Sequence, residues 1–410
     1  MTGVIRWCVA RVRVGATRLA VGLIVMLVTV AGILVPSAVT ANAAPTTLKI
    51  GLLNSTTGEF GSFYSPLVPG VEAWADWVNT HGGLNGHKVS LNILNNASSP
   101  SQIVANAHEA VDAGDVAIMV TDQLFDSVAP YLHSVGIPVY GWGITPGFFG
   151  AGQTNFFSYT GNVTNGKSTG TIKFILSKGK TKFAVLSDAS PADSGDLKAV
   201  STLITTLGGD VVYSNFNVDP TNTASELSVA QAVKGSGAQA VAIALLGSEA
   251  TMQVDLSQVG AGNVWVASGS DFQQTLPQQY GPALNNYLFY FFTAPFTVNS
   301  PGMREYLAAM KKYYPSDEYN DESLIGWVNA EVLAGGVEKL GSKPVTRASL
   351  VKATNTLKNY TGGGILAPLS FPAAHTQAPS CFAFEQVQNG KWVQVSGTKA
   401  NPFYCSKPLS

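Results

Sequence analysis

Charge is scarce in this chain of 410 residues: 12% of the residues are charged, whereas 46% are hydrophobic. The formal net charge is −1, and the only arginines after residue 43 are Arg304 and Arg347. A nucleic-acid or anionic-lipid partner requires a basic stripe, which this sequence lacks. The high apolar content argues against disorder, and the length suits two domains with separate cores.

Catalytic and metal-binding motifs are also missing. The sequence contains no G-x-S-x-G nucleophile elbow and no Walker A phosphate loop. The five histidines are scattered and do not have the spacing of metal ligands: His81, His87, His108, His133 and His375. We therefore expect a protein that is not an enzyme and that has no catalytic residue, no metal and no cofactor.

Residues 1–43 have the order of a signal peptide. Four arginines precede an apolar run over residues 19–35, and Ala41-Asn42-Ala43 then offers a small-residue cleavage site. Cleavage there predicts an exported protein on the extracellular or periplasmic face of a bacterial cell envelope. The alternative is an uncleaved membrane anchor, because the apolar run is close to the ~20 residues that span a bilayer.

Cysteine is rare as well, with three residues in the chain. Cys8 lies in the predicted signal peptide, which leaves Cys381 and Cys405 as an even pair. A disulfide between them is the default prediction for an exported protein. Alternating runs on either side of Asn389-Gly390 predict a β-hairpin between the two cysteines.

The stretch from Leu48 to Leu94 predicts a strand, a glycine- and serine-rich loop, a helix and a second strand. Val71, Trp74, Ala75 and Val78 have the spacing of one buried helix face. Such a unit opens a parallel α/β sheet, and its first loop lies at the carboxyl edge, where open α/β folds bind ligands.

The same α/β alternation continues along the chain and then restarts, which predicts an α/β fold with two sheets. The expected strands after the opening unit cover 116–120, 136–140, 182–186, 211–213, 240–245, 264–267 and 287–292. The main expected helices cover 100–113, 168–178, 194–207, 224–234, 249–260, 301–314, 322–340 and 347–357.

The order of the motifs resembles the solute receptors of branched-chain amino-acid-type ABC importers, the type I periplasmic binding proteins of the Leu/Ile/Val-binding family. The matching residues are Thr57-Gly58, Gly61, Tyr64, Asn79, Gly82-Gly83-Leu84-Asn85-Gly86, Lys88-Val89, Gly326-Trp327, Gly362-Gly363-Gly364 and Asn389-Gly390-Lys391-Trp392. The resemblance covers residues 47 to 405.

This resemblance implies a two-lobed type I periplasmic-binding-protein fold, in which each lobe is a parallel sheet flanked by helices and three hinge crossings join the lobes. The N-terminal lobe is expected to comprise residues 44–163 and 294–361. The C-terminal lobe is expected to comprise residues 164–293 and 362–410, with the last crossing at 362–366.

The resemblance also implies a function. The protein is expected to be a monomeric extracytoplasmic receptor that captures a small solute between closing lobes and delivers it to an ABC permease with its ATPase. The same fold serves receptors that signal, so a ligand sensor working with a separate signalling partner is the alternative.

The family's pattern, carried over by position, predicts ligand-binding residues in loops at the strand ends: Tyr64, Asp122, Gln123, Leu124, Phe125, Trp142, Gly143, Ser194, Leu246, Asp271 and Phe292. Relatives that bind aliphatic amino acids usually hold the ligand carboxylate with a serine or threonine pair. Here that loop carries Asp122 and Asp126, which would repel a carboxylate. This repulsion, together with the aromatic side chains of Phe125 and Trp142, predicts an amino-acid-like, apolar or aromatic solute rather than plain leucine or valine.

Four of these residues also have a simpler interpretation. Tyr64 and Trp142 could be packing residues, and Asp122 could cap the following helix. Asp271 could pair with an amine on the ligand or be solvated.

Overall fold

A computed structural model describes residues 46–245, 247–270, 272–317 and 319–409, without the side chains of residues 191 and 192. The predicted signal peptide, Leu246 and Asp271 therefore lie outside the described residues. The first sheet has five parallel strands in the order β2-β1-β3-β4-β5. These strands are β1 (Leu48–Asn54), β2 (Val89–Asn95), β3 (Ala117–Val120), β4 (Val139–Gly141) and β5 (Phe156–Ser158).

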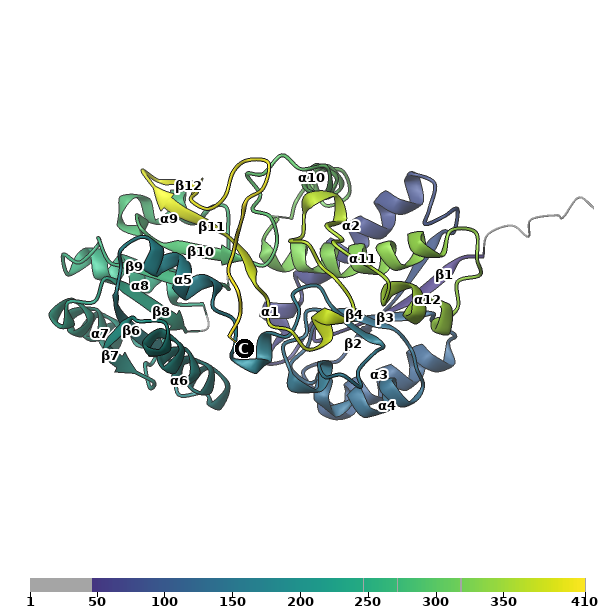
Figure 1. The fold of residues 1–410 in the computed structure, drawn as a ribbon, viewed down its shortest axis with the longest axis horizontal. Coiled ribbons are helices and arrows are strands. Elements are labelled where there is room, and N and C mark those ends of the chain that lie inside the picture. Colours follow the sequence, from purple (N-terminus) through teal and green to yellow (C-terminus); the bar gives the residue numbers. More distant parts are fainter. Residues whose placement is uncertain (1–45, 246, 271, 318, 410) are drawn as a thin grey trace, which may run out of the picture. The chain divides into compact units, whose positions relative to one another are not determined.

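Helices cover both faces of this sheet because alternate residues of its strands point to opposite sides. Ile50 and Leu52 pack in a core with Trp74, whereas Leu53 packs in a second core with Ile103. The helices α2 and α11 lie on the first of these faces, and α3 and α4 lie on the other (Figure 1). Their bounds, with those of α1, α10 and α12, are α1 (Gly61–Tyr64), α2 (Leu67–Thr80), α3 (Pro100–Asp112), α4 (Ala129–Ser134), α10 (Pro301–Tyr313), α11 (Asp321–Leu340) and α12 (Arg347–Thr354).

The helices α2 and α11 approach each other closely where two glycines face the neighbouring backbone. A Cβ atom on Gly70 would lie 1.8 Å from the carbonyl oxygen of Ser323, and one on Gly326 would lie 2.2 Å from that of Leu67. No side chain fits at either position, so both glycines are required for this helix pair to pack.

The second sheet has eight strands in the order β12-β11-β10-β9-β8-β6-β7, with β13 paired to β11. The strands β6 to β10 run parallel, whereas β11 is antiparallel to β10, β12 and β13. The sheet is therefore mixed, whereas a parallel sheet was expected. Its strands are β6 (Lys182–Ser187), β7 (Asp210–Asn215), β8 (Ala240–Ala244), β9 (Trp265–Ser268), β10 (Leu288–Phe291), β11 (Cys381–Gln388), β12 (Lys391–Gln394) and β13 (Phe403–Cys405).

This second sheet is also covered on both faces. Phe183 and Val185 of β6 pack with α5 and α6, whereas Val241 of β8 packs with α7 and α8. The helices are α5 (Gly170–Ser177), α6 (Pro191–Thr206), α7 (Thr223–Ser236), α8 (Glu249–Gln258) and α9 (Leu276–Tyr280). Single 3-10 turns complete the described chain: η1 (Phe125–Ser127), η2 (Pro146–Phe148), η3 (Val163–Asn165), η4 (Gly281–Leu284), η5 (Gly362–Gly364) and η6 (Ala373–His375).

The chain passes between the two sheets three times, as expected. It leaves the first sheet after β5, returns after β10 to form α10, α11 and α12, and enters the second sheet again at β11. Before that last passage, η5 contacts α10 and α11, and η6 contacts β5. Residues 362–375 thus lie with first-sheet elements, which favours a last crossing nearer 376–380 than the expected 362–366. The lobe boundaries themselves stay a prediction.

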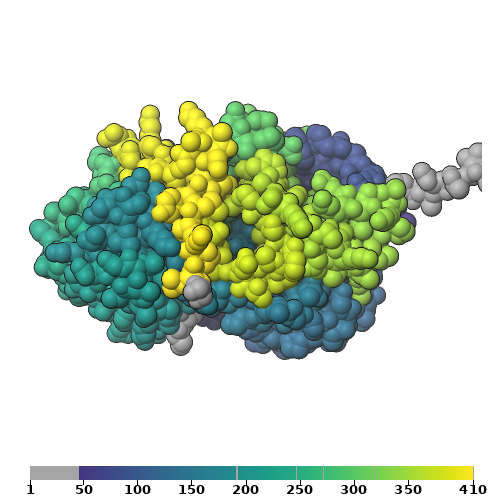
Figure 2. Space-filling view, viewed as in Figure 1, coloured from purple at the N-terminus to yellow at the C-terminus, as the bar shows by residue number. Residues whose placement is uncertain are grey.

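The predicted disulfide is present between Cys381 of β11 and Cys405 of β13, with an S–S distance of 2.10 Å. The tail beyond it is held against α5 and the residues before that helix. The hydroxyl of Thr169 donates to the carbonyl of Lys407 (2.8 Å), and the amide of Leu409 donates to the carbonyl of Lys167 (3.1 Å). Figure 2 shows the C-terminal part of the chain, in yellow, on the molecular surface that faces the viewer.

The predicted hairpin is also confirmed. Gln388 of β11 pairs with Lys391 of β12 across Asn389 and Gly390, which both have positive φ, at 52° and 71°. Two residues of that kind form the tight turn that matches the twist of the flanking strands.

A buried carboxyl joins the second crossing to the second sheet. Glu385 of β11 is fully buried, and its Oε1 accepts a hydrogen bond from the hydroxyl of Thr297. Its Oε2 has no hydrogen-bond partner among the described residues. Burial raises the pKa of Glu385 from 4.5 to about 7.

This carboxyl predicts a pH dependence of stability. As pH rises above 4.5, the unfolded chain releases the Glu385 proton before the folded protein does, so stability should fall between about pH 4.5 and 7. Glu385→Gln should remove this part of the decline and raise the urea midpoint at pH 7.5 relative to the parent. Glu109→Gln, at an exposed position of α3, is the control. Parallel pH profiles for the parent and Glu385→Gln would contradict the prediction.

Among the residues that the structure describes, no helix is long and apolar enough to cross a membrane.

Candidate functional site

The strands of the first sheet all end at one edge, and polar side chains gather where they end. Ser55 follows β1, Asn96 follows β2 and Asp122 comes two residues after β3. Because parallel strands place their carboxyl ends together, residues far apart in the sequence meet here.

Asp122 is the centre of this group and is 1% exposed. Its Oδ2 accepts hydrogen bonds from the Ser55 hydroxyl (2.7 Å) and the Asn96 amide (2.9 Å), and its Oδ1 accepts one from the backbone amide of Leu124 (2.9 Å). The carboxylate therefore joins three loops and caps the turn that follows it. This arrangement favours the structural interpretation of Asp122 over a direct contact with ligand.

The network predicts a loss of stability on substitution. Asp122→Ala would leave two buried donors and one half-buried donor without an acceptor, which should lower the free energy of unfolding by about 2 kcal/mol. Urea denaturation of the variant measures this, and Glu59→Ala, at an exposed position in the neighbouring loop, is the control. An unchanged unfolding midpoint for Asp122→Ala would show that the network contributes little.

Tyr64 lies at the same edge and is fully buried. Its ring contacts Phe63, with the centroids 5.0 Å apart, and its backbone carbonyl accepts a hydrogen bond from the side chain of Asn54 (3.2 Å). Burial and the charge of Asp122 raise the pKa of Tyr64, while Gln123 beside the hydroxyl lowers it. The hydroxyl is thus neutral at all physiological pH values.

The residues after Asp122 differ in their surroundings. Gln123 is exposed and Leu124 is half-buried. The ring of Phe125 packs in the core on the α3 and α4 face, with its centroid 4.8 Å from that of Phe148 and 5.2 Å from that of Phe156. Of these three predicted ligand residues, Gln123 is the one at the surface.

Trp142 follows β4 and connects the two sheets. Its backbone amide donates to the hydroxyl of Thr121 (3.1 Å), and its ring centroid lies 5.9 Å from that of Phe292, directly after β10. Both side chains are half-buried. The structure thus brings together two predicted ligand residues, one from the carboxyl edge of each sheet.

Gly143 has a packing role. A Cβ atom there would lie 2.6 Å from the ring of Phe149 and 2.7 Å from that of Phe148. Its backbone amide donates to the hydroxyl of Ser158 (3.3 Å). Any larger residue would displace these aromatic rings from the core.

On the second sheet, the predicted residue Ser194 is half-buried in the first turn of α6, and its amide donates to the carbonyl of Ser190 (3.0 Å). The prediction missed acids at this edge: Asp188 follows β6 directly, and Glu249 begins α8 after β8. The position of an acid immediately after an apolar strand was the signal that could have identified Asp188.

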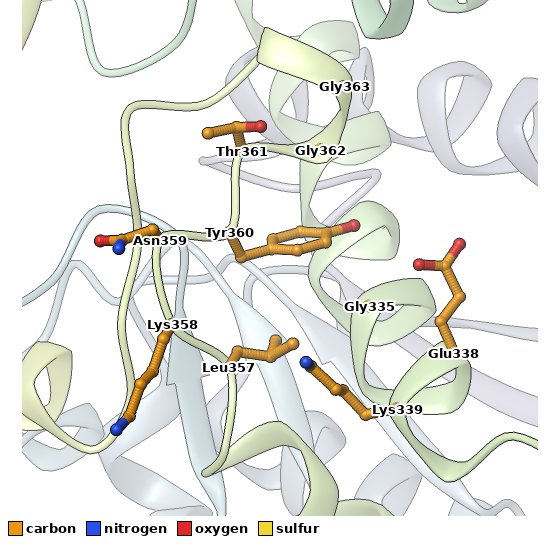
Figure 3. Close-up of a pocket in the computed structure, with 10 residues that line it drawn as sticks. All are labelled: Gly335, Glu338, Lys339, Leu357, Lys358, Asn359, Tyr360, Thr361, Gly362 and Gly363. Atoms are coloured by element: carbon orange, nitrogen blue, oxygen red, sulfur yellow. The ribbon is translucent and has the colours of Figure 1, made fainter.

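A surface pocket of about 440 Å³ lies elsewhere, between α11 and the loop that follows α12. In Figure 3 the ring of Tyr360 extends from that loop toward the helix that carries Gly335 and Glu338. Gly335 makes room for this ring, since a Cβ atom there would lie 2.7 Å from it. None of the predicted ligand residues lines this pocket.

Within the described part of the chain, no group of three or more histidine, cysteine or acidic residues has an arrangement that could hold a metal ion.

A family model for periplasmic binding proteins matches residues 47–391. No curated protein sequence gives a match.

Several solved structures share the fold. A leucine-binding protein from Thermotoga maritima is 17% identical, with a TM-score of 0.65 over 85% of this chain and 98% of that chain. A fatty acid ABC transporter substrate-binding protein from Thermomonospora curvata is 16% identical, with a TM-score of 0.67 over 88% and 93%. A solute-binding protein of an ABC transporter from R. palustris, in complex with benzoate, is 16% identical, with a TM-score of 0.67 over 88% and 99%. At these identities the likeness establishes the two-lobed type I fold.

Proposed function

Because the chain belongs to the periplasmic binding protein family, we propose that it is an extracytoplasmic receptor of an ABC importer that captures a small solute between two lobes. It binds its solute without chemical conversion, and the loaded receptor delivers the solute to a membrane permease with its ATPase. The proposal includes export of a monomer after cleavage of residues 1–43.

The contact between Trp142 and Phe292 carries this proposal. Each ring projects from the carboxyl edge of a different sheet, and their centroids are 5.9 Å apart. A solute that binds between these edges would contact both lobes at once, and contacts made only in the closed form shift an open–closed equilibrium toward closure. The rings suit an apolar or aromatic part of the solute.

A thermal-shift screen tests the proposal with amino acids, amides, aromatic acids, amines and short apolar solutes. A solute that binds only the folded protein raises its melting temperature. Trp142→Ala should then weaken the binding of that solute by about tenfold or more, because it removes a large apolar contact. Trp77→Ala is the matched control, since Trp77 is also half-buried but lies on α2. Unchanged affinity in Trp142→Ala would place the site elsewhere.

A further inference from the structure

The carboxyl edge of the second sheet is built around buried carboxylates. Asp188 is 8% exposed, and its Oδ1 accepts a hydrogen bond from the amide of Ser190 (2.8 Å). Glu249 is 2% exposed, and its Oε1 accepts hydrogen bonds from the amide of Leu245 (3.1 Å) and the hydroxyl of Ser270 (3.2 Å). These donors lie in the loops after β6, β8 and β9, so the protein's own carboxylates occupy donors that could otherwise bind an anion.

Two more acids lie in the first turns of α6, the half-buried Asp193 and the exposed Asp196. Burial and the neighbouring charge of Asp188 raise the pKa of Asp193 to about 6. Burial, and then the charges of Glu249 and Asp196, raise the pKa of Tyr290 to about 12. No basic side chain is among the groups that cause these shifts. The one lysine of α6, Lys198, instead lies over the ring of Phe216, 5.5 Å from its centroid.

The first sheet shows the same property at its own edge. Asp122 accepts hydrogen bonds from Ser55, Asn96 and the amide of Leu124. Asn329 of α11 adds a buried acceptor: it is 2% exposed, and its Nδ2 donates to the hydroxyl of Thr121 (3.2 Å). Its Oδ1 has no hydrogen-bond partner among the described residues. The same Thr121 hydroxyl accepts a hydrogen bond from the backbone amide of Trp142. The unsatisfied Oδ1 of Asn329 therefore lies close to the aromatic contact between the sheets.

Aromatic rings connect these acidic edges. The centroid of Phe292 lies 6.2 Å from that of Tyr290 and 5.9 Å from that of Trp142. Aromatic faces beside carboxylates favour an organic cation, because the ring quadrupole and the negative charges both attract it. A carboxylate would meet repulsion from these acids.

We propose that the solute is an organic cation without a free carboxylate, an amine or quaternary ammonium with an apolar part, selected by the acids near Tyr290 and by the rings of Phe292 and Trp142. This inference rests on the proposed receptor function and narrows its solute class. It contrasts with the R. palustris relative, whose structure is a complex with benzoate.

Matched pairs of probes test the charge requirement by calorimetry and thermal shift on the purified protein. Phenethylamine is compared with phenylalanine, and choline with betaine, because the second member of each pair carries a carboxylate. We expect phenethylamine or choline to raise the melting temperature and to bind at least about tenfold more tightly than its partner. The double substitution Asp193→Asn and Asp196→Asn should weaken binding of the cation about tenfold, whereas Asp210→Asn, exposed on β7, should leave it unchanged.

The outcomes separate this inference from the receptor function. If phenylalanine, betaine or benzoate binds more tightly than the amines, the charge proposal is overturned while the receptor function is supported. If the acidic variants bind the cation as the parent does, the assigned acids are wrong. If neither these probes nor the wider solute screen raises the melting temperature, the charge proposal and the receptor function both fail.

Discussion

Gly70→Val is expected to leave little folded protein at 37 °C. The valine Cβ would lie 1.8 Å from the carbonyl oxygen of Ser323, and this carbonyl belongs to α11, which cannot move without losing its contact with the first sheet. Overpacking against backbone, at a position where two helices cross, should lower the free energy of unfolding by at least about 4 kcal/mol. Urea denaturation followed by circular dichroism measures the change.

Gly235→Ala is the matched control for this substitution. Gly235 also lies in a helix, α7, but a Cβ atom there meets no atom within 4 Å. The alanine should stabilise the protein by up to about 1 kcal/mol because it restricts the unfolded chain. If Gly70→Val and Gly235→Ala have similar unfolding midpoints, then α2 and α11 are not packed as described.

Replacing both Cys381 and Cys405 with serine is expected to lower the free energy of unfolding by about 3.5 kcal/mol in the loop-entropy treatment. The disulfide closes a loop across a sequence separation of 24 residues and links β13 to β11. Without it, the tail would be held by β13 and by the hydrogen bonds near Lys167 and Thr169. Hydrogen exchange should therefore increase most in residues 403–409.

A reducing agent provides the control for the disulfide prediction. Dithiothreitol should destabilise the parent protein but not the double-serine variant. A parent protein that unfolds at the same urea concentration with and without reductant would show that the disulfide does not contribute to stability.

The opening of the fold could be predicted from the sequence because its signals are local. The spacing of Val71, Trp74 and Val78 identified α2, and the apolar runs on either side identified β1 and β2. The hairpin around Asn389 was predictable for the same reason, since two residues define its turn. The strands β5 and β13, of three residues each, were not predicted.

The candidate site was less predictable because its contacts are distant in the sequence. Asp122 has partners 67 and 26 residues away, and no pattern in its own loop indicates that Ser55 and Asn96 would saturate its carboxylate. Asp122 does not cap the following helix as one interpretation expected, because neither η1 nor α4 has a side-chain cap; its carboxylate instead joins three loops. The prediction that acids disfavour a carboxylate ligand rested on Asp122 and Asp126, and it did not include the acids at the edge of the second sheet, Asp188 and Glu249.

The last strands of the second sheet have a consequence for how the chain folds as it emerges during synthesis. The strand β10 has β11 as its neighbour on one side, and β11 starts only at Cys381, after the whole of α10, α11 and α12. Until those residues emerge, β10 presents an unpaired edge with exposed aromatic side chains, a feature that promotes association between nascent chains. The long sequence separation of the β10 and β11 contact also makes its closure slow.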